Sequence, residues 1–123
     1  MARTIAIVED DADIRGLLDL NLRAAGYETA FARDGVMAIG MIRKSRPDLI
    51  LLDIGLPGGD GFVILDRLRE FDALATIPVI VISAAVLPDA RKRIELSGVA
   101  AFVEKPFDVG RLLQTVESIL AAR

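Results

Sequence analysis

Acidic, hydroxyl and amine side chains stand at or just after the ends of four apolar runs in this 123-residue chain. They are Glu9, Asp10, Asp53, Ser83 and Lys105. Carboxylates held close together repel each other unless a cation compensates them. The three acids and one lysine carry a net charge of −2, which one Mg²⁺ would neutralise. A carboxylate can also attack phosphorus and form an aspartyl-phosphate, while an amine and a metal stabilise charge on the phosphoryl oxygens. Brought together, these side chains could bind a divalent metal and accept a phosphoryl group.

The elements that must position these groups alternate along the chain as strand and helix. The predicted strands are Ile5–Val8, Tyr27–Ala32, Leu49–Leu52, Pro78–Ile82 and Ala101–Val103. The predicted helices are Asp13–Ala25, Asp34–Ser45, Phe62–Phe71, Pro88–Leu96 and Asp108–Leu120. Three of the strands are continuously apolar, which is typical of strands that helices cover on both faces. We therefore predict a doubly wound α/β fold with a five-stranded parallel sheet, of the flavodoxin-like (βα)5 type.

Each polar residue at a strand end, taken alone, has a simpler explanation than function. Asp11 or Asp13 is expected to cap the first helix, and Asp60 the third. A serine after a strand often bonds its own backbone, and a lysine is usually solvated. The prediction of a site depends on their joint occurrence, because ligands bind beyond the carboxyl ends of parallel strands. The second strand brings no such group and is expected at an edge of the sheet.

Composition excludes several chemistries. The chain has no Cys and no His, so it has no thiol nucleophile, disulfide, imidazole base or histidine metal ligand. It has no Trp and one Tyr, and its net charge is −3, which together argue against direct nucleic-acid binding. No apolar stretch approaches the roughly 20 residues of a membrane span, and no signal-peptide core is visible. We expect a cytoplasmic protein without membrane insertion.

Several short motifs occur in order along nearly the whole chain. They are Ile7-Val8-Glu9-Asp10-Asp11, Asp48-Leu49-Ile50-Leu51-Leu52-Asp53, Leu56-Pro57-Gly58-Gly59-Asp60-Gly61, Val81-Ile82-Ser83-Ala84 and Lys105-Pro106-Phe107. Each motif is weak alone, but together, at these spacings, they are specific. The chain resembles a response-regulator receiver domain, the phosphoacceptor of two-component signalling. The resemblance implies one receiver domain over residues 1–123, a signalling domain and not an enzyme, whose only chemistry is its own phosphorylation and dephosphorylation.

The resemblance also implies a role for each site residue. Asp53 would accept the phosphoryl group from a histidine kinase or a histidine phosphotransfer protein. The Mg²⁺ ligands would be Glu9, Asp10, Asp53 and the backbone carbonyl of Gly55. Ser83 would hydrogen-bond the phosphoryl group and Lys105 would form an ion pair with it. The Lys105-Pro106 peptide is commonly cis in such domains.

A switch and a partner-binding face follow from the same resemblance. Phosphorylation would draw Ser83 toward the phosphoryl group, and Phe102, at the family's aromatic switch position, would turn into the space left behind. The readout face would comprise the fourth helix, the fifth strand and the last helix. It would bind a downstream protein target or an output domain that lies outside this chain. The apolar loop Ala84–Leu87 beside it would either pack over the sheet edge or dock a partner.

Two departures from common family patterns carry expectations of their own. Ala100 and Ala101 stand where many winged-helix regulators carry acids, which argues against dimerisation through that face. Gly55 and Ala85 are small, so the phosphoryl group is expected to be open to in-line attack by water.

Three alternative functions fit parts of the sequence. Asp11-Ala12-Asp13 resembles the nucleophile motif of haloacid-dehalogenase-type phosphotransferases, although it falls at a helix start. A receiver-like binding module that no longer takes phosphate is the second alternative. A flavodoxin is the third, but carboxylates after the first strand would repel the FMN phosphate.

Overall fold

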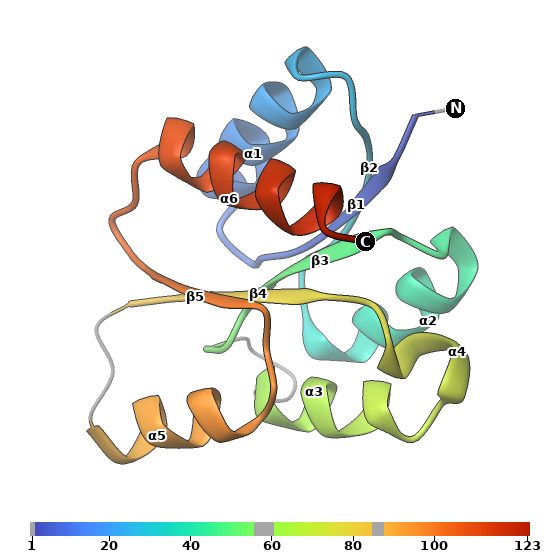
Figure 1. Ribbon diagram of the computed structural model, residues 1–123, viewed down its shortest axis with the longest axis vertical. Coiled ribbons are helices and arrows are strands. Elements are labelled where there is room, and N and C mark those ends of the chain that lie inside the picture. The colour runs from blue at the N-terminus through green and yellow to red at the C-terminus, as the bar shows by residue number, and fades with distance from the viewer. Residues whose placement is uncertain (1, 56–60, 85–87) are drawn as a thin grey trace.

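The computed structural model describes residues 2–55, 61–84 and 88–123, which form five strands and six helices (Figure 1). The strands are β1 (Thr4–Val8), β2 (Glu28–Ala32), β3 (Leu49–Asp53), β4 (Val79–Ser83) and β5 (Ala101–Glu104). The helices are α1 (Ala12–Ala24), α2 (Gly35–Ser45), α3 (Gly61–Arg69), α4 (Asp72–Ala75), α5 (Pro88–Leu96) and α6 (Val109–Ala121). Asp60 and Ala85–Leu87, for which the sequence carried expectations, lie outside these residues.

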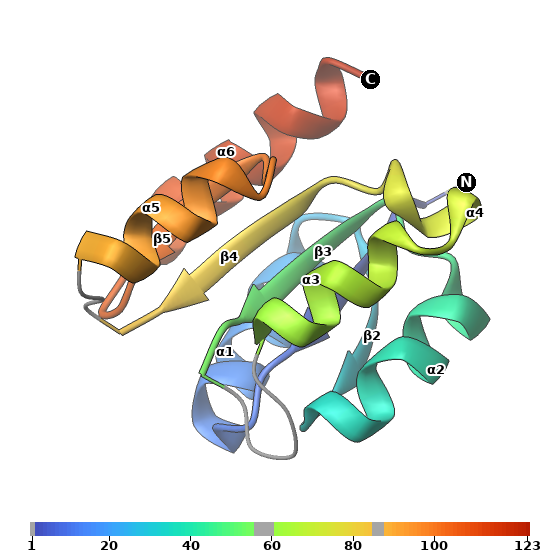
Figure 2. The same ribbon diagram turned by 90° about the horizontal axis from the view of Figure 1, so that it is seen from below.

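The sheet is parallel throughout, with strand order β2-β1-β3-β4-β5. Helices α1 and α6 cover one face, and α2, α3, α4 and α5 cover the other (Figures 1 and 2). The predicted doubly wound, flavodoxin-like fold is therefore confirmed, with β2 at an edge. The strand order reverses beside β1, since β2 pairs on one side of it and β3 on the other. Open α/β sheets place their sites at such a reversal, outside the carboxyl ends of the strands.

Two separate apolar cores explain why the central strands are apolar at every position. In β1, Ile5 and Ile7 pack with α1 and α6, whereas Ala6 and Val8 pack with α2 and α3. The same alternation holds in β3 and β4. Because successive strand residues point to opposite faces, a strand covered on both faces needs an apolar side chain at each step.

Three aspartates begin helices, as the capping preferences predict. Asp11 accepts hydrogen bonds from the backbone N–H groups of Asp13 and Ile14, which makes Asp11, not Asp13, the cap of α1. The Asp34 carboxylate caps α2, and the Asp108 carboxylate caps α6. The first of these caps turns the chain directly from the acidic end of β1 into α1.

The structure corrects several predicted boundaries. The helix predicted over Phe62–Phe71 spans only Gly61–Arg69, and a separate turn of helix, α4, follows it. The strand predicted from Tyr27 begins at Glu28, because the Tyr27 N–H donates to Leu22 O in the turn that ends α1. Strands β3, β4 and β5 each extend to the polar residue that the prediction placed just after them.

Candidate functional site

Three buried polar residues lie at the carboxyl ends of three adjacent strands. Glu9 follows β1, Asp53 ends β3 and Ser83 ends β4, with exposures of 2%, 7% and 6%. The strand register places them side by side at the carboxyl ends of the strands. Val8, just before Glu9, pairs with Leu52, just before Asp53, and Asp53 pairs with Ile82, just before Ser83. The backbone of Glu9 still belongs to the sheet, because its N–H donates to Ala32 O at 3.1 Å. The predicted convergence of Glu9, Asp53 and Ser83 is thus present.

Lys105 joins the two buried acids. Its Nζ lies 2.7 Å from Glu9 Oε1 and 3.1 Å from Asp53 Oδ2. Its backbone N–H donates to Ser83 O at 2.7 Å, which ties the segment after β5 to the end of β4. The Lys105-Pro106 peptide is cis, as expected.

The carboxylates can hold a metal ion. Glu9, Asp10 and Asp53 each offer an oxygen, and these oxygens lie within 4.8 Å of one another. Asp10 is exposed, whereas the other two are buried, so the cluster faces solvent on one side. A few carboxylates with room for water are the ligands that Mg²⁺ prefers.

Gly55 lies beside Asp53, while metal binding by its backbone carbonyl stays a prediction. Its backbone N–H donates to Asp53 Oδ1 at 2.9 Å. That bond holds one carboxylate oxygen of Asp53, while Lys105 contacts the other. Both oxygens of Asp53 are therefore oriented by neighbouring groups.

Burial and close packing shift the ionisation of the cluster in opposite directions. Burial and the proximity of Asp53 raise the pKa of Glu9 to about 7, although the hydrogen bond from Lys105 acts in the opposite direction. Burial would also raise the pKa of Asp53, but hydrogen bonds from Glu9, the Gly55 N–H and Lys105 outweigh it and lower that pKa. The pKa of Lys105 is raised, because its bonds to both acids outweigh its burial. Without metal, the pKa of Glu9 makes it lose its proton around neutral pH, whereas the lowered pKa of Asp53 keeps that carboxylate ionised there.

Sequence reasoning missed two residues that support the site. The Arg15 guanidinium of α1 donates to Glu9 O at 3.0 Å and lies 5.3 Å from the centre of the Phe31 ring. A cation in the first turns of a helix opposes the helix dipole, and this was the available signal. Gly61 is the second: a Cβ there would lie 2.5 Å from the Ile54 Cα, next to Asp53.

Phe102 is not one of the residues of the acidic cluster. It is half-buried on β5, opposite Val81, and packs against the core on the α5 side of the sheet. The guanidinium of Arg91 on α5 lies 5.5 Å from the centre of its ring and forms an ion pair with Glu104 at 3.0 Å. In this structure the Phe102 ring is thus covered by a side chain of α5.

The sequence matches the response regulator receiver domain over residues 5–117. Together with the fold and the acidic cluster, this match shows that the chain belongs to that family. The protein is therefore a receiver domain of two-component signalling, a signalling domain rather than an enzyme with a turned-over substrate. Receiver domains act with histidine kinases and downstream targets. Within the described residues, no helix is long and apolar enough to cross a membrane.

Similar proteins cover almost the whole chain. The polar-differentiation response regulator DivK of Brucella anthropi is 38% identical over 121 residues, 98% of each chain. The receiver domain of sensor histidine kinase PA1611 from Pseudomonas aeruginosa PAO1, solved with magnesium coordinated in its active-site cleft, is 26% identical with a TM-score of 0.88, covering 98% of this chain and 99% of that one. The phosphorylated cyanobacterial phytochrome response regulator RcpA is 30% identical with a TM-score of 0.82, covering 97% and 91%.

Proposed function

We propose that Asp53 accepts a phosphoryl group from the phosphohistidine of a histidine kinase or a histidine phosphotransfer protein. The observation that carries the proposal is the placement of Asp53, a buried and ionised carboxylate held by the Gly55 N–H on one oxygen and by Lys105 on the other. A carboxylate oxygen attacks phosphorus, the phosphorus–nitrogen bond breaks, and the histidine leaves with the electron pair of that bond. The product is an aspartyl-phosphate on this chain.

The acidic cluster fits a Mg²⁺ ion, which would screen the negative charges of the acids and the incoming phosphoryl group. Glu9, Asp10, Asp53 and the backbone carbonyl of Gly55 are its proposed ligands, since the three carboxylates lie close enough to share one ion. The magnesium in the PA1611 receiver and the phosphorylated state of RcpA support this assignment by similarity. Lys105 would exchange its bond to Asp53 for one to a phosphoryl oxygen.

The same proposal gives the switch. Ser83 would donate its hydroxyl to the phosphoryl group, and the end of β4 would move with it. Phe102 would then lose its cover by Arg91 and turn inward. The surface formed by α5, β5 and α6 would change shape and bind a downstream protein or an output domain. A cytoplasmic location stays a prediction.

Intact-mass spectrometry after incubation with a small phosphodonor and Mg²⁺ tests the proposal. Wild type should gain the mass of one phosphoryl group, and Asp53→Asn should not. Asp13→Asn is the matched control, because Asp13 is an exposed acid at the same edge of the sheet. Chelation of Mg²⁺ should abolish the adduct. Lack of an adduct on wild type would favour the receiver-like binding module.

The haloacid-dehalogenase alternative has weaker support. The Asp11 carboxylate already accepts two backbone hydrogen bonds at the start of α1, and both Asp11 and Asp13 are exposed. That reading requires repeated turnover of a phosphomonoester with Mg²⁺. The receiver reading requires a single phosphoryl group on Asp53 and no such turnover.

A further inference from the structure

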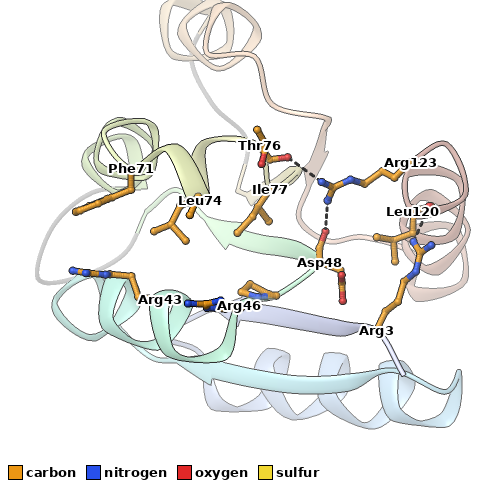
Figure 3. A pocket seen from close by; sticks show the side chains of 12 residues that line it. Arg3, Arg43, Arg46, Asp48, Phe71, Leu74, Thr76, Ile77, Leu120 and Arg123 are labelled. Carbon is orange, nitrogen blue, oxygen red and sulfur yellow. Dashed lines mark hydrogen bonds between the residues drawn. The ribbon is translucent and has the colours of Figure 1, made fainter. Parts of the chain in front are cut away.

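A pocket of about 700 Å³ (Figure 3) lies at the amino ends of the strands, whereas the acidic cluster lies at their carboxyl ends. Its walls come from the segments just before β1, β3 and β4, from the carboxyl ends of α2 and α6, and from α4 with Phe71 just before it. Small-molecule sites in proteins have volumes of roughly 300–1,000 Å³. The pocket is therefore large enough for a metabolite-sized ligand and shares no residue with the acidic cluster.

The charge of this pocket is strongly positive, although the chain as a whole is acidic. Its lining includes four arginines, Arg3, Arg43, Arg46 and Arg123. Among the lining residues that the structure describes, the one acid is Asp48, whose Oδ2 accepts a hydrogen bond from the Thr4 N–H at 2.8 Å. Throughout the described ranges, no carboxylate lies within 4.0 Å of any of the four guanidinium groups. Among the described lining residues, four positive charges thus stand against one negative charge, and none of the four guanidinium groups forms an ion pair.

Two of the four arginines are structural anchors. Arg3 donates to Leu120 O at 2.7 Å, and Arg123 donates to Asp48 O at 3.0 Å (Figure 3). Both therefore tie the carboxyl end of α6 to the sheet. Their guanidinium groups add to the positive potential, but their backbone bonds make them poor positions for a binding test.

The other two arginines lie along one side of the pocket and face an apolar wall. Figure 3 shows Arg43 and Arg46 across from Phe71, Leu74 and Ile77. The Arg43 guanidinium lies 5.0 Å from the centre of the Phe71 ring, so it is held against one end of the apolar wall. A planar guanidinium matches the paired oxygens of a phosphate group, and it also stacks on flat rings.

We propose that this pocket binds a nucleoside phosphate. The phosphate would contact Arg43 and Arg46, and the base would lie against the apolar wall. Free phosphate would leave Leu74 and Ile77 of that wall uncovered, and a nucleoside without phosphate would leave Arg46 unused and the charge of Arg43, which stacks on Phe71, uncompensated. Neither half of the ligand alone satisfies both sides of the pocket.

Isothermal titration at low salt tests the proposal with AMP, adenosine and inorganic phosphate as probes. AMP should bind, and adenosine and phosphate should each bind at least about tenfold more weakly, because a charged hydrogen bond or a buried ring contributes about that factor. Arg46→Asn is the sharpest variant, because the backbone of Arg46 has φ 46°, a left-handed conformation that Asn tolerates. Arg43→Gln keeps the helix propensity of α2.

The double variant Arg43→Gln, Arg46→Asn should weaken AMP binding about tenfold or more. Arg23→Gln, which removes an arginine paired with Asp19 on α1, should leave it unchanged. Asp53→Asn should also leave it unchanged, which separates this site from the phosphoacceptor site. Absence of AMP binding, or AMP binding that the double variant does not weaken, overturns the proposal. Phosphate binding as tightly as AMP overturns the assignment of the apolar wall to the base.

Discussion

The Lys105 ammonium lies closer to Glu9 Oε1, at 2.7 Å, than to Asp53 Oδ2, at 3.1 Å. Glu9 has the raised pKa of the pair, about 7, whereas the pKa of Asp53 is lowered. When no metal is bound, the negative charge of the cluster is reduced in two ways: by the ammonium of Lys105 and by the proton that Glu9 retains to higher pH. A metal that replaces this arrangement must displace a proton from Glu9, which makes metal binding depend on pH.

Mg²⁺ binding should release a proton below neutral pH. Glu9 is protonated below about pH 7 and must ionise to bind the ion, so affinity should fall as pH falls, by at most about tenfold per unit. Titration calorimetry in buffers of different ionisation enthalpy should give close to one released proton at pH 6 and close to none at pH 8. Glu9→Gln should bind Mg²⁺ more weakly at both pH values and release no proton. Equal proton release by wild type at both pH values would contradict the prediction.

The stability of the metal-free protein should carry the opposite pH signature. The pKa of Glu9 rises from 4.5 to about 7 on folding, so the folded state binds the Glu9 proton more tightly than the unfolded state does. Its stabilising contribution is complete below pH 4.5 and is lost as pH rises through 7. Urea unfolding in the presence of a chelator should show wild type losing stability relative to Glu9→Gln between pH 5 and 8. A constant difference between the two proteins would refute the assignment to Glu9.

Gly61→Ala should destabilise the protein by about 1–3 kcal/mol, the usual cost of forcing an extra methyl into a packed site. Its Cβ would lie 2.5 Å from the Ile54 Cα, so the backbone beside Asp53 must move. Gly40→Ala on α2 is the control, because a Cβ there meets nothing within 4 Å. That control should gain about 0.5–1 kcal/mol from helix propensity. Chemical denaturation compares the two variants, and equal effects would contradict the close approach.

Arg91→Ala should release the Phe102 ring while changing stability by less than about 1 kcal/mol, since its ion pair with Glu104 is exposed. NMR of the Phe102 ring protons should show a second ring position in the unphosphorylated variant. Arg93→Ala, which removes a cation stacked on Phe62 from the same helix, is the control and should leave the Phe102 signals unchanged. Identical ring spectra in wild type and Arg91→Ala would show that Arg91 does not hold the ring.

Gly55→Asn should change the rate of Asp53 dephosphorylation several-fold. A Cβ at position 55 would lie 3.7 Å from Asp53 Oδ1, so a polar side chain there can reach the path of an attacking water. Time-resolved phosphoprotein mass spectrometry gives the rate. The control is Gly16→Asn on α1, where the added atom has open space. Equal decay rates in wild type and Gly55→Asn would show that the residue at position 55 does not affect hydrolysis of the aspartyl-phosphate.

The strands of the parallel sheet and the acidic cluster could be predicted because their signals are local. A β-branched run that ends in an acid, as at Val8-Glu9 and Leu52-Asp53, gives both the strand and the side chain that leaves it. Parallel pairing then fixes where those side chains meet. The roles assigned to Ser83, Phe102 and the Gly55 carbonyl came from family resemblance and stay predictions.

Other features depend on tertiary contacts that no local pattern indicates. Helix α4 is a single turn fixed by burial of Leu74, too short for a helical period. The contact of Arg15 with the Glu9 carbonyl requires the turn into α1 to be known. The arginine pocket gathers segments from both termini and the middle of the chain. Each of its arginines, considered alone in the sequence, therefore looks like an ordinary surface charge.

The strands that carry the acidic cluster at one end begin beside the arginine pocket at the other. A five-residue strand spans about 16 Å, so the metal-free protein separates the negative cluster from the positive pocket along its strand axis, which the overall charge of −3 conceals. Such a dipole orients the molecule in the field of an approaching partner before contact. Phosphorylation of Asp53 would add about one negative charge at the carboxyl ends of the strands, so the modified form would present that end more strongly to a cationic surface.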